Sequence, residues 1–248
     1  MAGWDEASLH RWLGERLPGT RVDGIPRGHV HDAAVLELAG GRLAVCTDRC
    51  EEGVHADLGV DAAALGRKAA ARTLSDLAAT AARPVGLLLA LAAGPDQPEA
   101  RLRAALEGLI AEGARHGAPL VGGDLTARPG PLSLAVTALG EAPADPPGRD
   151  RGRPGDLVLV TGPLGGSRAG RHLAIEPRLA TGRALHAAGV RAMLDLSDGL
   201  ALDLSRLARL SGVVARLEDL PAHPDALTAA GSSGRDRAAR SAPGRPPE

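Results

Sequence analysis

The feature that most constrains the fold of this chain is an apolar run that ends abruptly in carboxylates and a glycine. The clearest example spans residues 192–200, with the sequence AMLDLSDGL. A strand that leads through an acidic turn into a helix presents oxygen ligands of the kind that Mg²⁺ prefers. Asp195 and Asp198 are the candidate ligands, and Ser197 between them offers a hydroxyl. On the alternative interpretation, Ser197 and Asp198 only cap the helix that begins near Gly199.

Other aspartates stand in similar settings, beside apolar runs or glycine turns. They are Asp32, Asp48, Asp76 and Asp124, with hydroxyls nearby at Thr47, Ser75 and Thr126. The sequence shows no nucleophile–base pair of the Ser-His-Asp kind. Many carboxylates without a covalent catalyst are typical of phosphoryl transfer from a metal–nucleotide complex, in which positioning and charge neutralisation do most of the work. Any single aspartate could be only a turn former, but all of them in comparable settings favour a metal site.

Hydrophobic periodicity predicts helices that alternate with strands. The expected helices cover residues 5–17, 61–82, 98–116, 177–189 and about 199–210. The expected strands include residues 85–91, 132–139, 157–161 and 213–217, and two apolar runs joined at Gly40-Gly41 are expected to form a hairpin. Asp48 and Asp124 are expected at the ends of strands. Gly122 and Gly123 would then let backbone amides approach a phosphate.

Composition limits both the core and the partners of the chain. Apolar residues make up 44% of the 248 residues, but Phe and Tyr are absent and only two Trp occur, so an aliphatic core is expected. The formal net charge of −1 gives no concentrated basic face for nucleic acid. The sequence has no signal-peptide pattern and no apolar run that could cross a bilayer, so no membrane partner is expected.

The two cysteines, Cys46 and Cys50, do not form a disulfide framework, which favours a reduced, cytoplasmic setting. A zinc site drawn from the cysteines and histidines is an alternative. Its members would be Cys46, Cys50, His55, His29 and His31. Their spacing matches no standard zinc motif, so we favour the magnesium interpretation.

Six blocks of the sequence occur in an order and spacing typical of one enzyme family. They are His31–Val35, Thr47-Asp48 with Glu52–His55, Leu74–Ala79, Gly122–Thr126, Arg149 with Pro154–Asp156, and Asp195–Gly199. With these blocks, roughly residues 5–225 resemble thiamine-monophosphate kinase, within the superfamily that includes aminoimidazole ribonucleotide synthase. The Glu-Gly-Val-His block points to the thiamine kinase within that superfamily.

The resemblance implies an α/β (α+β) fold of two domains. Residues 1–145 would form an N-terminal α/β domain of mixed sheet and helices that binds ATP and Mg²⁺, and residues 146–225 a partial α+β C-terminal domain. The family pairs its N-terminal sheet with that of a second subunit, which implies a homodimer. The implied reaction is ATP-dependent phosphorylation of thiamine monophosphate to thiamine diphosphate, with several Mg²⁺ ions. Residues 226–248 lack periodicity and are expected to form a disordered tail.

The resemblance also implies roles for single residues. The implied metal ligands are Asp32, Cys46, Thr47, Asp48, Asp76, Asp124, Asp195 and Asp198. The implied ATP-binding residues are Arg149, Ser197, Gly122 and Gly123, and the implied contact of thiamine monophosphate is His55. Cys46 stands where the family usually has Ser. No covalent catalytic residue is implied.

Three departures from the family pattern matter. His31 replaces a carboxylate, and an imidazole suits Mg²⁺ less well than an oxygen ligand. Ala56 replaces an aromatic residue that would wall the thiamine pocket. The Gly-Gly-Glu-Asp block of the family does not occur after residue 225. We therefore expect an incomplete C-terminal domain and kinase activity that is weak or absent.

Two rival functions stay open. The first is another ATP-dependent enzyme of the superfamily, such as an aminoimidazole ribonucleotide synthase-like protein, although that branch lacks the Glu-Gly-Val-His pattern. The second is a non-catalytic remnant that binds nucleotide without turning it over. Retention of six carboxylates favours the enzyme, whereas the incomplete C-terminal pattern favours the remnant.

Overall fold

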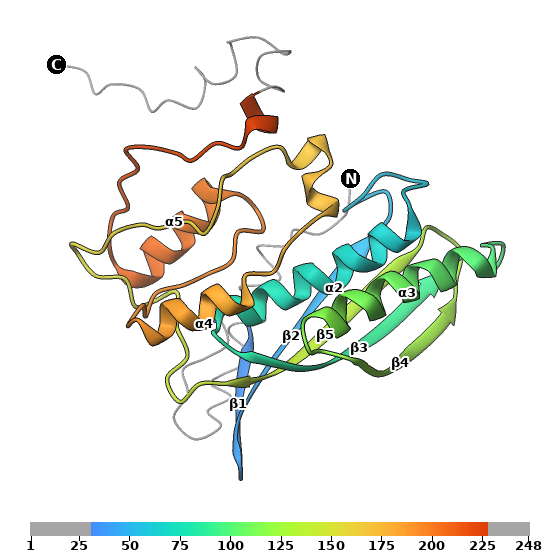
Figure 1. Cartoon of the computed structure of the whole chain (residues 1–248), viewed down its shortest axis with the longest axis horizontal. Helices are drawn as coiled ribbons and strands as arrows, with labels where there is room; N and C mark the ends of the chain where they lie inside the picture. The colour runs from blue at the N-terminus through green and yellow to red at the C-terminus, as the bar shows by residue number, and fades with distance from the viewer. Residues whose placement is uncertain (1–30, 228–248) are drawn as a thin grey trace, which may run out of the picture.

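The computed structural model describes residues 31–227, and a five-stranded mixed sheet lies at its centre (Figure 1). The strands are β1 (Ala34–Leu38), β2 (Gly41–Glu51), β3 (Arg83–Ala93), β4 (Leu120–Ala127) and β5 (Ser133–Ala142). Their order across the sheet is β1-β2-β5-β3-β4. The pair β3 and β4 is parallel, and the other neighbours are antiparallel. The predicted mixed α/β class is confirmed.

The hairpin predicted at the glycine pair is also confirmed, with its turn one residue earlier. Leu38 pairs with Gly41, so the two-residue turn consists of Ala39 and Gly40. A short turn of this kind sets the register of the two strands. Residues of β1 and β2 therefore alternate between the two faces of the sheet in step.

Two aspartates that were predicted at strand ends lie inside strands instead. Asp48 pairs with Val136 of β5, and Asp124 pairs with Ala90 of β3. Ladder hydrogen bonds occupy the backbone on both sides of each carboxylate, and they extend the strands past it. The prediction that β2 ends at Asp48 is therefore wrong.

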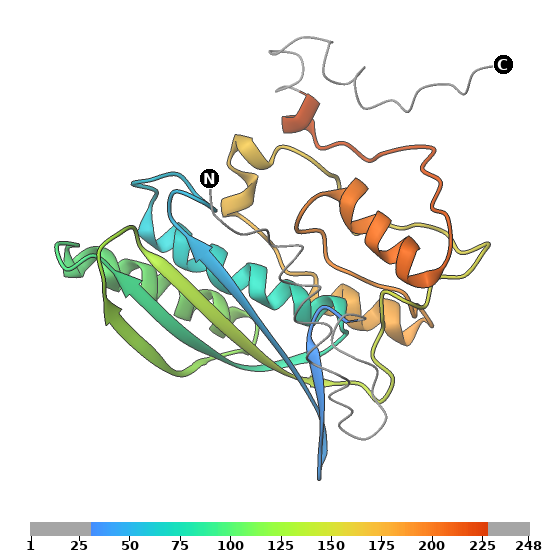
Figure 2. The same ribbon diagram turned by 180° about the vertical axis from the view of Figure 1, so that it is seen from behind.

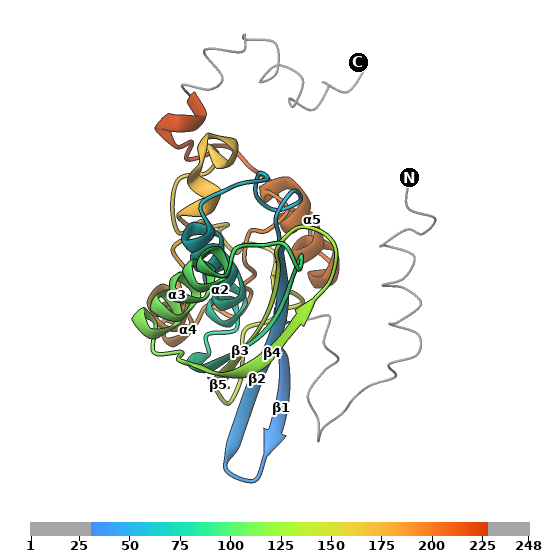
Figure 3. The ribbon, with the colours of Figure 1, turned by 90° about the vertical axis from the view of Figure 1, so that its right-hand side faces the viewer.

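Helices α2 (Ala62–Ala79) and α3 (Glu99–Arg115) pack on one face of the sheet (Figure 3). The carboxylate of Asp61 accepts a hydrogen bond of 2.7 Å from the amide of Ala64, and this contact caps the N-terminus of α2. Both helices lie close to their predicted ranges.

The core between helices and sheet is aliphatic, as the composition requires. Its largest fully buried side chains include Leu65, Leu74, Leu77, Leu87, Leu109, Leu132, Leu134 and Val136. The two helices approach closely because glycines face backbone. A Cβ on Gly66 would lie 1.9 Å from the carbonyl oxygen of Ala105, and one on Gly108 would lie 2.1 Å from that of Ala63. Any side chain at these glycines would push the helices apart.

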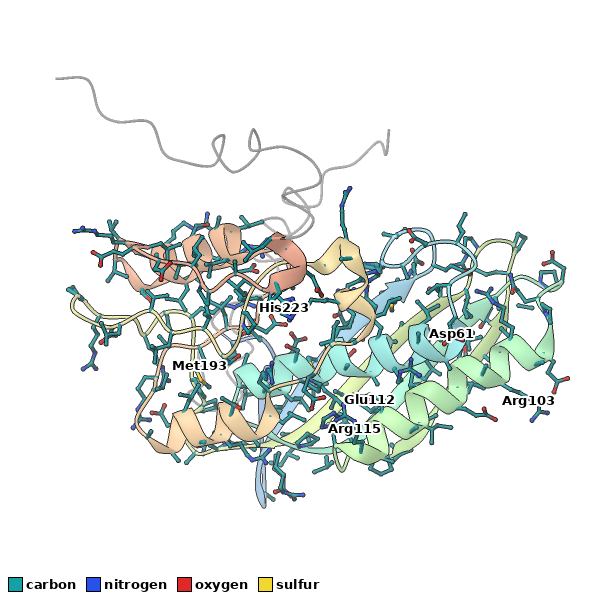
Figure 4. The ribbon with its side chains drawn as sticks, turned by 45° about the horizontal axis from the view of Figure 1, so that its top comes forward. Asp61, Arg103, Glu112, Arg115, Met193 and His223 are labelled. Carbon is teal, nitrogen blue, oxygen red and sulfur yellow. The ribbon has the colours of Figure 1, made fainter. Side chains whose placement is uncertain are left out.

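The chain beyond the sheet adds α4 (Leu179–Ala187), α5 (Leu200–Ser211) and two short 3₁₀ turns, η1 (Ser167–Ala169) and η2 (Arg171–Leu173). α4 packs end-on against α2 (Figure 1). An ion-pair network ties α3 to the segment that precedes α4. In it, Arg115 donates to Glu112, its neighbour in Figure 4, and to Glu176, at 2.6 and 2.8 Å.

Two predicted strands are wrong. Residues 157–161 and 213–217 form no strand, although both are apolar runs. Their side chains are largely exposed, with Leu157 at 86% and Val214 at 95%. A strand requires a hydrogen-bonded neighbour, and within residues 31–227 the nearby segments offer only an isolated bridge between Leu164 and Ala222.

The sheet face opposite α2 and α3 carries no helix within the described part of the chain (Figure 2). Leu88, Val121 and Leu125 are exposed there or along the β4 edge, at 38%, 59% and 68%. The predicted helix at residues 5–17 and the tail beyond residue 227 lie outside the described residues. Among the helices of residues 31–227, none has the length and apolar content needed to span a membrane.

Candidate metal centre

Three of the predicted metal ligands meet at one point of the structure. Carboxylate oxygens of Asp32, Asp76 and Asp195 all lie within 4.8 Å of one another. Asp32 lies two residues before the start of β1, Asp76 lies in the last turn of α2, and Asp195 lies in the loop between α4 and α5. The fold therefore gathers three distant segments, and no other group of His, Cys, Asp or Glu side chains in residues 31–227 is this compact.

Burial and mutual repulsion disfavour the charged forms of the three carboxylates. Burial, followed by repulsion from Asp195, Asp32 and Asp48, raises the pKa of Asp76 to about 9. Burial and then repulsion from Asp32 raise the pKa of Asp195 to about 6, although a hydrogen bond from Ser75 opposes this shift. Like charges held together away from water favour the protonated form. A divalent cation among them would remove that repulsion.

Asp32 is the most enclosed member of the group, and its charge is only partly satisfied. One oxygen, Oδ1, accepts a hydrogen bond from Nη2 of Arg149, and the Asp32 side chain is only 1% exposed. Its other oxygen, Oδ2, and Nε of Arg149 are buried without a hydrogen-bond partner in the described part of the chain. Leaving such atoms unpaired is costly, so this corner of the site is suited to a ligand. Burial raises the pKa of Asp32, and Arg149 opposes that shift.

His31, which stands where the family pattern has a carboxylate, does not join the group. Its Nδ1 lies 2.7 Å from the carbonyl oxygen of Pro147, and the side chain is buried. Of the alternative zinc set, Cys46, Cys50, His31 and His55 form no compact group, and His29 lies outside the described residues.

The turn after Asp195 is held by a residue that the sequence analysis did not single out. Oδ2 of buried Asp203 accepts hydrogen bonds from the amides of Ser197, Asp198 and Gly199, at 3.1, 3.0 and 3.1 Å. An acidic residue in the first turn of a helix is a recognised signal for this kind of capping. Asp203 therefore fixes the backbone that carries Asp195 and Asp198.

The capping interpretation of Asp198 is not what the structure shows. α5 begins after Gly199 without a side-chain cap. The Asp198 carboxylate instead lies 2.6 Å from Nη1 of Arg206, which also contacts Asp203 at 2.9 Å. Asp198 is exposed and lies outside the compact group.

Asp48 lies on the face of β2 that packs against α2, and its charge is paired. Its Oδ2 lies 2.5 Å from Nε of Arg72 on α2. Asp48 contributes to the raised pKa of Asp76 and so lies near the group without belonging to it. Two residues earlier, Cys46 donates its thiol hydrogen to the carbonyl oxygen of Thr73. Burial and the nearby Asp76 raise the pKa of Cys46 far above its usual range, so this position offers a neutral thiol.

Other predicted site residues lie apart from the compact group. The hydroxyl of Thr47 donates to the carbonyl oxygen of Val136, on the sheet face opposite Asp48. Asp124 is exposed on edge strand β4, where it accepts a hydrogen bond of 3.0 Å from Thr126. Whether these residues bind metal stays a prediction.

The glycine pair that was expected to face a phosphate lies inside β4 instead of in a turn. A Cβ on Gly123 would lie 1.9 Å from the carbonyl oxygen of Leu89 on β3, and one on Gly122 would lie 3.3 Å from the Leu88 side chain. Close approach of neighbouring strands therefore explains the small residues at this point.

The Glu-Gly-Val-His block forms a tight turn at the end of β2. Nδ1 of His55 accepts a hydrogen bond of 2.9 Å from the amide of Glu51, and burial lowers the pKa of His55. Glu52, the first residue of this block, is buried and pairs with Arg101 at 2.5 Å. Its carboxylate also accepts a hydrogen bond of 2.6 Å from the amide of Gly59. The contacts of the buried Glu52 carboxylate therefore hold this turn in place.

Known proteins share this fold and part of this sequence. Residues 30–142 match the family model described as AIR synthase related protein, N-terminal domain. Thiamine-monophosphate kinase of Rhodopirellula baltica is 37% identical over 218 residues, which cover 82% of this chain and 68% of that protein. The enzyme of that name from Mycobacterium tuberculosis is 35% identical over 240 residues, covering 89% and 71%.

A solved structure of similar fold also belongs to this comparison. AaThiL complexed with AMPPCP and TMP superposes with a TM-score of 0.69 at 27% identity, covering 84% of this chain and 70% of that one. The fold is therefore that of the AIR synthase-related proteins. Identity above 30% over more than two thirds of the curated relatives shows that this chain belongs to the thiamine-monophosphate kinase family.

Proposed function

We propose that this chain catalyses the ATP-dependent phosphorylation of thiamine monophosphate to thiamine diphosphate. The observation that carries the proposal is the compact group of Asp32, Asp76 and Asp195, in a chain of this family. A relative of similar fold was solved with AMPPCP and TMP, which supports a nucleotide and thiamine monophosphate as the two ligands.

The residues of the compact group suit a magnesium ion. The donor set consists of carboxylate oxygens only, which Mg²⁺ prefers. One of those oxygens, Oδ2 of Asp32, is buried without a partner in the described part of the chain. Bound there, Mg²⁺ would neutralise charge on the transferred phosphoryl group. Asp48 and Asp198 are the proposed ligands of further ions, and each could offer one carboxylate oxygen to a cation while the other oxygen stays paired with its arginine.

The remaining polar groups have complementary tasks. Arg149, whose Nε is buried and unpartnered among the described residues, would bind phosphate oxygens of ATP. Asp203 keeps the turn at Ser197 in place beside them. In the reaction, an oxygen of the acceptor phosphate forms a bond to the γ-phosphorus as the bond to the leaving oxygen breaks, and ADP departs. His55 is the proposed contact for thiamine monophosphate.

We further propose that the protein is a cytoplasmic homodimer with its N-terminal domain in residues 1–145 and its C-terminal one from residue 146. The open sheet face supports a second copy as its cover, because Leu88 on β3 and Val121 on β4 are exposed at 38% and 59%. Light scattering of the purified chain tests the dimer. A charged substitution, Val121→Asp, should shift the protein to monomer, and an unaltered mass for that variant would overturn the proposed interface.

The function is tested by coupled detection of ADP release from the purified chain with ATP, Mg²⁺ and thiamine monophosphate. ADP release that requires both thiamine monophosphate and Mg²⁺ supports the kinase. Asp195→Asn should abolish it, whereas Glu107→Gln, on the exposed side of α3, should not. Binding of AMPPCP without any turnover would overturn the kinase proposal in favour of a nucleotide-binding protein.

A further inference from the structure

Arg72 is a partly buried cation that belongs neither to the family motifs nor to the proposed metal centre. It lies on α2 between Lys68 and Asp76, four residues from each. Residues four apart share one face of a helix. This face of α2 therefore presents two cations followed by a carboxylate of the metal centre.

Only one nitrogen of the Arg72 guanidinium, Nε, donates a hydrogen bond to a side chain. Its Nε contacts Oδ2 of Asp48 at 2.5 Å, and its side chain is 23% exposed. The two terminal nitrogens donate no side-chain hydrogen bond within residues 31–227. The terminal nitrogens of a guanidinium form a planar fork that matches two oxygens of a phosphate. The contact with Asp48 fixes the plane of that fork in advance.

The residues around Arg72 belong to the proposed acceptor side of the site. Lys68, the only lysine of the chain, donates to the carbonyl oxygen of His55. Its Nζ also lies 2.7 Å from Nδ1 of His172 on η2. After burial, the charges of Arg72 and Lys68 lower the pKa of His55, so both cations lie close to its imidazole.

We propose that Arg72 binds the acceptor phosphate of thiamine monophosphate, and that Lys68 is a positioning residue that holds the His55 turn beside it. The inference rests on the proposed function and names the residues of its acceptor subsite. A substrate phosphate is a dianion, and the fork of Arg72 supplies the charge and the geometry to hold it.

The position of Arg72 also suits the transfer. Along α2, one turn of about 5.4 Å separates Arg72 from Asp76. A phosphate held at Arg72 therefore lies next to the group of carboxylates where the γ-phosphate of ATP is proposed to bind. The new bond joins an oxygen of the acceptor phosphate to the γ-phosphorus, and the bond from that phosphorus to ADP breaks with its electron pair leaving on ADP.

The test compares ligand binding by Arg72→Gln, Arg72→Lys and the unaltered chain, using calorimetric titration. The probes are thiamine monophosphate, unphosphorylated thiamine, and Mg²⁺-AMPPCP. We expect Arg72→Gln to weaken thiamine monophosphate about 10- to 100-fold, the range for a lost hydrogen bond to a charged group. Binding of thiamine and of Mg²⁺-AMPPCP should change less than about threefold. Arg72→Lys should fall between, because an ammonium keeps the charge without the fork.

Arg103→Gln is the matched control, because Arg103 pairs with Glu99 on the exposed face of α3. It should bind every probe like the unaltered chain. If the unaltered chain binds thiamine monophosphate and both Arg72 variants bind it equally well, the inference is wrong and the proposed function stands. If the unaltered chain binds no thiamine monophosphate, both are overturned. Equal weakening of Mg²⁺-AMPPCP by Arg72→Gln would also overturn the inference, because Arg72 would then act on the whole site.

Discussion

Arg149 donates a hydrogen bond to Asp32 across 117 positions of the sequence, and this pair joins the loop after β5 to the entry of β1. Because the Asp32 side chain is almost fully enclosed, the pair holds a charge inside the protein beside two further carboxylates. Removing one partner of a buried pair leaves the other uncompensated. The pair therefore fixes one corner of the candidate metal centre.

We predict that Arg149→Ala lowers the free energy of unfolding by about 3 kcal/mol, the cost of leaving a buried charge unpaired. Urea denaturation measures this value. The control is Arg83→Ala, whose exposed pair with Glu141 should matter little. A loss for Arg149→Ala no larger than that of the control would mean that the Asp32 carboxylate is protonated or hydrated.

The stability of the metal-free protein should fall as the pH rises. The pKa of Asp76 is raised from 3.8 to about 9, and that of Asp195 to about 6. Between these values the folded state binds more protons than the unfolded state, so the free energy of unfolding decreases with pH. The stabilising effect of the protonated groups is complete below pH 3.8 and is lost as pH approaches 9.

Urea titrations in chelator at several pH values check this pH dependence. Asp76→Asn should flatten the decline above about pH 6, because the titrating group is gone, while Glu107→Gln should leave it unchanged. A stability that rises steadily from pH 6 to pH 9 in the unaltered chain would contradict the account.

Asp203→Ala should destabilise the turn that carries Asp198. Three backbone amides lose their acceptor in this variant, and Arg206 loses one of its two partners. Buried groups left unpaired cost about 1–3 kcal/mol each, and the exposed turn can recover part of this from water. We expect a loss of about 2–4 kcal/mol by urea denaturation. Ser205→Ala, on the exposed side of α5, should lose less than about 0.5 kcal/mol.

His55→Ala should impair use of thiamine monophosphate more than binding of ATP. The imidazole closes the Glu51–His55 turn on the proposed acceptor side of the site, and His55 is not part of the compact group of carboxylates. A rise of the KM for thiamine monophosphate of about tenfold, with little change for ATP, is expected from the loss of one polar contact. Equal losses for both substrates would show that His55 is only structural.

Local signals in the sequence identify much of the fold. Asp61 and the alanine-rich run after it predict α2 within a few residues, and the Gly40-Gly41 pair predicts the hairpin. Apolar runs at residues 157–161 and 213–217 mislead, because an apolar run identifies a strand only if a neighbour completes its hydrogen bonds.

The site is harder to predict than the fold. The motifs around Asp124 and Asp195 look alike in sequence, yet one lies in an edge strand and the other in the compact group. The sequence pattern gives no distance between segments as far apart as Asp32 and Asp195. The prediction that both bind metal therefore rested on the family resemblance, and only the fold shows that the two carboxylates lie close together. Asp203 was missed although an acidic residue in the first turn of a helix is a capping signal, because that signal does not say which backbone amides it will hold.

We expect Asp32, Asp76 and Asp195 to hold a divalent cation together. Titration with Mn²⁺, followed by electron paramagnetic resonance of the free ion, tests this binding without any need for turnover, because carboxylate sites that bind Mg²⁺ also bind Mn²⁺. The unaltered chain and Glu107→Gln should bind Mn²⁺, and Asp195→Asn and Asp76→Asn should bind it at least about tenfold more weakly. Equal binding by all four proteins would show that these carboxylates do not hold the cation.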